Sequence, residues 1–186
     1  MSLPRSRYAV AREISNVDII SPRRLAYKSR RGVTRKLYAK DEALASLDGN
    51  DYFAPLARKA RGSTKKHVAN VGNVLWVDID ELDGLEPRLA RVPLRPSLIV
   101  ASGVKGFRAF RKLAEPVARI RSRSGTGPLA LLLEADHSWN KDRIARLPGS
   151  YRVETDTFAE VVEFSAAVYE PNEFRFLPEE TVAPPS

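Results

Sequence analysis

The residues best suited to carry chemistry begin with two aspartates, Asp78 and Asp80, directly after an apolar run at residues 74–77. This pattern predicts a buried strand with two carboxylates at its end. Because side chains alternate along a strand, both aspartates are expected on one face, with Ile79 pointing into the core. Neighbouring carboxylates repel each other, and Mg²⁺ or Mn²⁺, which prefers carboxylate oxygen, would remove that cost. A solvated acidic strand end is the alternative.

A cationic glycine turn follows a second apolar strand, which is expected over residues 97–101. The turn contains Ser102, Gly103, Lys105, Gly106 and Arg108. Its glycines allow a tight turn whose backbone N–H groups can face an anion. Further along, Arg146 precedes a Pro-Gly turn. Carboxylates followed by two cationic turns indicate a site for a metal-bound polyphosphate.

In this order the motifs resemble those of the archaeo-eukaryotic primase superfamily, in its primase-polymerase branch from plasmids and phages. The family's strand ending in Asp-x-Asp is matched by residues 74–80, and residues 64–71 before it also resemble that branch. The second motif is matched by residues 102–108, except that Arg108 stands where the family carries a nucleotide-contacting His. The third is matched by residues 131–136 and 146–149, so the resemblance covers residues 52–162.

The resemblance implies a fold and an activity. The fold would be α+β, or α/β-like, with a central mixed β-sheet flanked by helices and an RRM-like catalytic core. The activity would be template-directed nucleotidyl transfer by two metal ions, as a DNA primase or primer-extending DNA polymerase in the replication of a mobile element. The implied partners are a single-stranded DNA template and primer, NTPs or dNTPs, and a replicative helicase.

The resemblance also implies roles for individual residues. Asp78, Asp80 and Asp136 would hold Mg²⁺ or Mn²⁺ and carry the catalysis. Asp142 is the alternative third carboxylate, but Asp136 follows the apolar run at residues 129–133, so a buried element would carry it to the site. The triphosphate would be bound by Ser102, Lys105, Arg108 and Arg146. Arg108 can replace the family's His as a phosphate ligand, because guanidinium binds phosphate bidentately and stays charged.

Two other classes of function remain open. Arg108 at the His position suggests a subunit with the primase fold and weakened catalysis. Such a subunit would bind nucleic acid or nucleotide. A nuclease could use the same carboxylates, although a Lys- and Arg-lined glycine turn suits a triphosphate better than a scissile backbone.

The charge of the chain favours a polyanionic partner. The formal net charge is +8, and its basic residues gather in clusters that can neutralise phosphates. The residues expected to bind nucleic acid are Arg58, Lys65, Lys66, Arg111 and Lys112. Tyr27 and Tyr38 lie in a further basic stretch and could stack on bases or pack in the core.

Length and composition bound the organisation of the chain. Its 186 residues fit one domain, and the absence of cysteine excludes disulfides and Cys-based zinc sites. No apolar run is long enough to span a bilayer and there is no secretory signal, so a cytoplasmic protein is expected. We expect a basic N-terminal segment at residues 1–40, a catalytic domain at 41–177 and a Pro-rich tail or linker at 178–186.

The remaining elements are predicted from local patterns. Helices are expected over residues 41–47, 85–91 and 129–135, with a glycine-rich loop at 122–128. Strands are expected over residues 68–80, 111–113, 151–154 and 158–168. The dipeptide Glu115-Pro116 is expected to end the strand before it.

Overall fold

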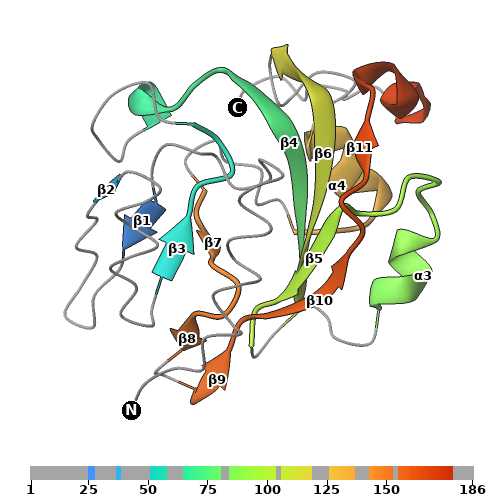
Figure 1. The fold of residues 1–186 in the computed structure, drawn as a ribbon. Helices are drawn as coiled ribbons and strands as arrows, with labels where there is room; N and C mark the ends of the chain where they lie inside the picture. Colours follow the sequence, from blue (N-terminus) through green and yellow to red (C-terminus); the bar gives the residue numbers. More distant parts are fainter. Residues whose placement is uncertain are drawn as a thin grey trace, which may run out of the picture.

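A five-stranded sheet lies between a four-stranded sheet and a set of short helices (Figure 1). The computed structural model describes residues 25–27, 37–38, 51–57, 65–80, 84–103, 106–118, 126–136, 143–152 and 155–177. Within these residues, no helix has the length and apolar character needed to cross a membrane.

The five-stranded sheet is built around β6 (Phe107–Ala118). β4 (Val71–Ile79) and β5 (Leu98–Ala101) pair with it in antiparallel fashion. β10 (Glu160–Phe164) extends the sheet beyond β5, and β11 (Val168–Tyr169) runs parallel to β6. The sheet is therefore mixed, as the resemblance implied.

The four-stranded sheet joins remote parts of the chain in the order β2-β1-β3-β7. Its strands are β1 (Leu25–Tyr27), β2 (Leu37–Tyr38), β3 (Asp51–Phe53) and β7 (Ala145–Arg146). Tyr27 and Tyr38 thus belong to strands. β8 (Tyr151–Arg152) and β9 (Thr157–Phe158) form a separate antiparallel pair.

Side-chain alternation along β4 divides the core into two clusters. Val74 and Trp76 pack towards the four-stranded sheet, in a cluster that includes Phe53. Leu75 and Val77 pack on the opposite face, which the helices cover. These helices are α3 (Leu85–Leu89), α4 (Thr126–Leu132) and the 3₁₀ helix η2 (Pro171–Phe176). Because both faces of β4 are buried, its apolar run shows no polar alternation.

The strand predicted at residues 111–113 is longer than expected, since β6 passes through Pro116. The register of β4 and β6 shifts between Gly72 and Val74, which pair with Val117 and Lys112. Pro116 therefore lies in an irregular part of the ladder, where a missing N–H costs no regular hydrogen bond. The prediction that Glu115-Pro116 ends the strand was wrong for this reason.

Two further predictions need a change of bounds. α4 begins at Thr126, inside the predicted glycine-rich loop, and Pro128 fits the first turn of a helix because no N–H is needed there. The strand predicted at residues 158–168 is divided among β9, β10 and β11. Ala166, with φ 53°, turns the chain between β10 and β11. The helix predicted at 41–47, the tail at 178–186 and most of the segment at 1–40 lie outside the described residues.

Candidate active site

Asp78 and Asp80 lie at the end of β4, as the sequence predicts. Asp78 follows Val74 and Trp76 on the same face of the strand, so it lies at the border of the core that faces the four-stranded sheet. It is 6% exposed, whereas Asp80 is exposed just beyond the strand. The antiparallel register places Asp78 opposite Arg108 on β6.

Asp136 lies next to Asp78 in the structure. The chain turns after α4 at Glu134, whose φ is 48°, and Asp136 then forms an isolated β-bridge with Asp78. The backbone N–H of Asp136 donates to the carbonyl oxygen of Asp78 over 2.9 Å. A carboxylate from the end of α4 is thereby anchored beside the Asp-x-Asp strand, and the Asp136 side chain is exposed. Asp142 lies outside the described residues.

Two arginines bind the same carboxylate oxygen of Asp78. Arg108 Nη2 forms an ion pair with Asp78 Oδ2, and Arg143 Nη2 lies 2.9 Å from that oxygen. Burial by itself raises the pKa of Asp78, but the charge and hydrogen bond of Arg108, together with those of Arg143, hold that pKa below its usual value. The carboxylate is therefore ionised at neutral pH. The sequence analysis assigned no role to Arg143, although it precedes Arg146 in the same short cationic segment.

The donor set suits a hard divalent cation in its chemistry. An ionised Asp78 is flanked by Asp80 in sequence and by Asp136 through a backbone hydrogen bond. Among the described residues, however, no three Asp, Glu, His or Cys side chains are grouped closely enough to hold a metal ion. The two arginines on Asp78 already bind Oδ2, one of the two carboxylate oxygens that a cation could use. A metal ion bound through Oδ2 would require these side chains to rearrange.

The glycine turn is pressed against the end of β4. Gly106 has φ +72°, and a Cβ on it would lie 1.8 Å from the carbonyl oxygen of Ile79 and 2.6 Å from Asp80 Cα. Only glycine fits this approach. The N–H of Ser102 donates to the carbonyl oxygen of Gly106 over 3.2 Å, so this donor closes the turn. Lys105 lies outside the described residues.

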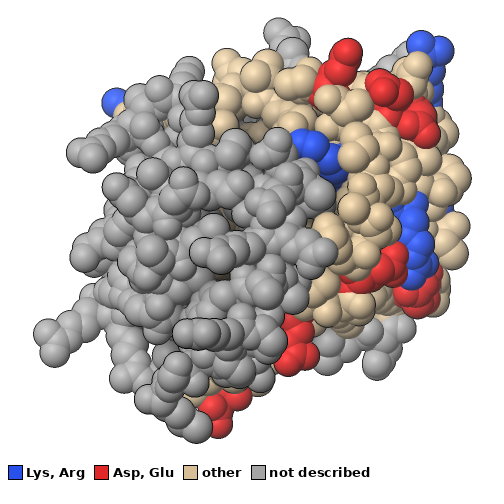
Figure 2. All heavy atoms as spheres, viewed as in Figure 1, with Lys and Arg blue, Asp and Glu red and all other residues tan. Residues whose placement is uncertain are grey.

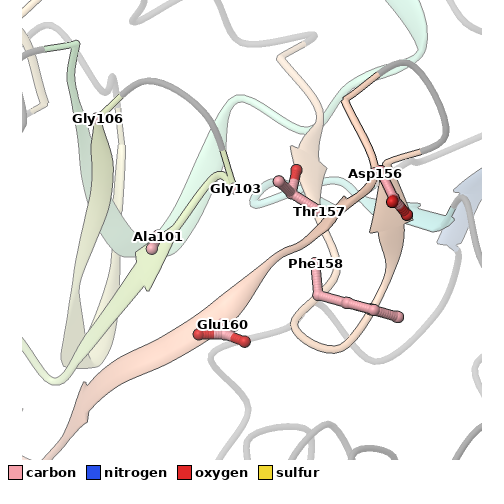
Figure 3. Close-up of a pocket in the computed structure, with 7 residues that line it drawn as sticks. All are labelled: Ala101, Gly103, Gly106, Asp156, Thr157, Phe158 and Glu160. Carbon is pink, nitrogen blue, oxygen red and sulfur yellow. The ribbon is translucent and has the colours of Figure 1, made fainter.

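A pocket of about 440 Å³ opens beside this turn. Its lining residues are Ala101, Gly103, Gly106, Asp156, Thr157, Phe158 and Glu160 (Figure 3). The pocket lies next to Asp80, because Gly106 contacts the backbone of that residue. Two of the lining residues, Asp156 and Glu160, carry carboxylates, and the Asp156 carboxylate accepts a hydrogen bond from the Tyr151 hydroxyl.

Arg146 is held by Tyr52, its antiparallel partner on β3. Its Nη2 donates to the Tyr52 hydroxyl over 2.6 Å, and its guanidinium carbon lies 4.7 Å from the centre of the Tyr52 ring. Its Nη1 also donates to the carbonyl oxygen of Tyr151. The contact of Tyr52 with Arg146 could not be predicted from the sequence, since a single tyrosine belongs to no recognisable motif.

The residues predicted to bind nucleic acid divide into two groups. Lys65 and Lys66 are exposed in the 3₁₀ helix η1 (Lys65–His67), just before β4. Arg111 is fully buried and Lys112 is 8% exposed, because both lie in the middle of β6, which has layers packed on each face. Direct phosphate contact by these two is not supported by the structure, and we do not retain them in the proposed DNA surface. Arg58 lies outside the described residues.

Comparisons with known proteins identify the fold. No family model and no curated protein matches the chain. Among solved structures, the AEP domain of the primase-polymerase of cyanophage S-2L matches with a TM-score of 0.71 and 20% identity, over 94% of this chain and 98% of that chain. The catalytic domain of primase RepB′ in complex with initiator DNA matches with a TM-score of 0.63 and 18% identity, over 91% of this chain and 92% of that chain.

A further structure of primase RepB′ matches with a TM-score of 0.61 and 16% identity, over 92% of this chain and 61% of that chain. The chain therefore has an archaeo-eukaryotic primase-like α+β fold of the primase-polymerase type. The fold predicted from the motif resemblance is confirmed.

Proposed function

We propose that this chain is the catalytic domain of a primase-polymerase, which joins nucleotides on a DNA template during replication of a mobile element. The observation that carries the proposal is the ionised Asp78, anchored to Asp136 and covered by Arg108 and Arg143, in a fold shared with a phage primase-polymerase. Anionic metal ligands directly beside cationic phosphate ligands are what phosphoryl transfer requires.

In this proposal Asp78, Asp80 and Asp136 would hold two Mg²⁺ or Mn²⁺ ions, which would lower the pKa of the primer 3′-hydroxyl and stabilise negative charge on the leaving pyrophosphate. The 3′-hydroxyl would lose its proton to water, and its oxygen would form a bond to the α-phosphorus of the incoming nucleotide. The bond from that phosphorus to the bridging oxygen would break, and pyrophosphate would leave with the electron pair.

The cationic residues position the triphosphate for this reaction. Arg108 and Arg143 would reach the phosphates from beside Asp78. Ser102 and Lys105 are the further phosphate ligands that we propose from the sequence motif. Arg146 can contribute through its position on β7, where Tyr52 fixes the guanidinium. Holding the α-phosphorus in line with the 3′ oxygen supplies much of the rate enhancement expected of such a site.

Single-stranded DNA template and primer would lie along Arg58, Lys65 and Lys66. The support is the exposure of the two lysines before β4 and the structural likeness to a RepB′ catalytic domain that was solved with initiator DNA. A replicative helicase is the further partner that we propose from the resemblance.

The test is a primer-synthesis and primer-extension assay with Mn²⁺ on a single-stranded template. We expect activity in the wild-type chain and a loss of at least about a hundredfold in Asp78→Ala, because a metal ligand is removed. Glu86→Ala is the matched control, since this exposed carboxylate lies on α3 and pairs with Arg95 rather than with Arg108 or Arg143. Full activity in Asp78→Ala would exclude this site.

A second candidate is a binding subunit with the same fold and weakened catalysis. It is favoured by the two arginines on Asp78, which oppose metal binding in the unliganded chain, and by Arg108 at the usual His position. This candidate predicts nucleotide and DNA binding in the wild-type chain, with no primer extension at any Mn²⁺ concentration.

A further inference from the structure

The contacts of Asp78 place two positive charges where a metal ion would be expected to bind. The guanidinium groups of Arg108 and Arg143 both donate to Asp78 Oδ2. A divalent cation that approaches Asp78 Oδ2 finds this oxygen already bound to both guanidinium groups, whose positive charges repel it over a few ångströms. The metal alone is therefore poorly suited to displace both side chains.

The two arginines are held to different degrees. Arg108 has a side chain that is 15% exposed, and its Nη1 donates weakly to the carbonyl oxygen of Ile144 over 3.4 Å. Its buried Nε has no acceptor among the described residues. Arg143 has a side chain that is 37% exposed and stands on the outer side of Asp78, in the segment before β7. A ligand from solvent therefore meets Arg143 first.

The chemistry of the two guanidinium groups favours a polyanion as the ligand that releases them from Asp78. Both groups donate to the same carboxylate oxygen, so either can exchange that shared acceptor for another anion. A triphosphate offers oxygens that bind guanidinium bidentately, and it brings its own divalent cation to the carboxylate that the arginines leave.

From this geometry we propose that Arg143, together with Arg108, is a latch on Asp78 that nucleoside triphosphate releases. The arginines exchange the carboxylate for the phosphates, and Asp78 Oδ2 becomes available to the metal in that exchange. Nucleotide and metal binding are then positively coupled, and the coupling is reciprocal. The inference rests on the proposed function, because it takes Asp78 as a metal ligand, and it makes Arg143 a ligand of Asp78 in the unliganded chain and of the phosphates in the complex.

The experiment measures Mn²⁺ binding to the chain by electron paramagnetic resonance, with and without a non-hydrolysable nucleoside triphosphate. In the wild-type chain we expect weak binding of Mn²⁺ alone and a gain on the order of tenfold or more with the analogue, after correction for Mn²⁺ bound by the free analogue. Arg143→Ala should bind Mn²⁺ alone about three- to tenfold more tightly than the wild type, as expected when one contact to the carboxylate is lost. The gain in Mn²⁺ affinity on adding the analogue should be smaller in this variant.

Matched variants separate the possible outcomes. Arg143→Lys keeps the charge and should stay closer to the wild type, whereas Arg175→Ala removes an exposed arginine from η2 and should change nothing. Thermal unfolding of Arg143→Ala confirms that the variant is folded, so that a gain of Mn²⁺ affinity can be assigned to the released carboxylate. Unchanged or weaker Mn²⁺ binding in Arg143→Ala, with the coupling intact, would overturn the latch and leave the proposed function standing. Mn²⁺ binding that Asp78→Asn does not reduce would overturn both.

Discussion

At the scale of single residues, Asp78 and Arg108 decide how this site behaves. They occupy facing positions on β4 and β6, and the carboxylate and the guanidinium form an ion pair in the unliganded chain. Arg108 is the residue at which this chain differs from the motif that it otherwise resembles. Removing its permanently charged guanidinium tests whether Arg108 binds nucleotide or DNA.

Arg108→Ala should weaken nucleoside triphosphate binding about ten- to a hundredfold, because a charge-assisted contact contributes roughly 1.5–3 kcal/mol. Arg108→His should be affected less, since it restores the family's usual contact. Titration of nucleotide and of single-stranded DNA against each variant measures both effects. If DNA binding alone changes, Arg108 is a template contact and our assignment is wrong.

The ion pair of Asp78 with Arg108 should also make the stability of the chain depend on pH. Asp78→Asn should lower the free energy of unfolding by about 1–3 kcal/mol near neutral pH, because the partly buried Arg108 loses its charged partner. The pKa of Asp78 is lowered by folding, so its contribution is complete above the ordinary value of 3.8 and disappears as the pH falls through the lower folded pKa.

The difference in unfolding free energy between the wild type and Asp78→Asn should therefore shrink below about pH 4. Denaturant unfolding at a series of pH values tests this, with the exposed Asp80→Asn as the control. A difference that grows towards acid pH would contradict the sign.

At the scale of secondary-structure elements, the glycine turn between β5 and β6 fixes the end of β4. Gly106 and Gly103 have positive φ values, and both come close to neighbouring chain segments. The turn can therefore support the Asp80 backbone on one side and the pocket beside β9 on the other. This arrangement depends on the absence of side chains at the two glycines and on the hydrogen bond from the Ser102 N–H to the Gly106 carbonyl oxygen.

Gly106→Ala should destabilise the chain by more than about 2 kcal/mol and impair metal and nucleotide binding, because a Cβ would collide with the backbone of β4. Gly72→Ala is the matched control. A Cβ there would meet the Leu56 side chain, which can rotate, and no positive φ is involved. Thermal unfolding of both variants measures the difference, and equal losses would argue against the close approach.

At the scale of the whole molecule, the described residues of the face shown in Figure 2 carry acidic and basic side chains that lie mixed. Ion pairs between the two kinds occur among the described residues, as between Arg95 and both Glu86 and Glu163. We expect the DNA-binding surface to lie near η1, just before the start of β4.

Lys65→Ala and Lys66→Ala should each weaken single-stranded DNA binding and reduce its salt dependence. The slope of log affinity against log salt should fall by about 0.7 for each lost phosphate contact. Fluorescence anisotropy over a range of salt concentrations provides the measurement, and Arg175→Ala provides the comparison. Slopes that stay at the wild-type value would place the DNA elsewhere.

Local sequence determined the elements that lead to the site. The apolar residues of β4 and the alternation that puts Asp78 and Asp80 at its end are encoded within a few neighbouring positions, as is the positive φ of the glycine turn. The order of these motifs was also enough to predict the fold that the solved structures confirm.

Tertiary structure alone decided which charged residues meet. Arg143 reaches Asp78, and Tyr52 holds Arg146, because β7 joins the sheet that packs against β4. Arg111 has the positive charge of a phosphate ligand, but its side chain is buried because layers cover both faces of β6. Such contacts depend on how distant elements pack, and no short segment of sequence contains that information.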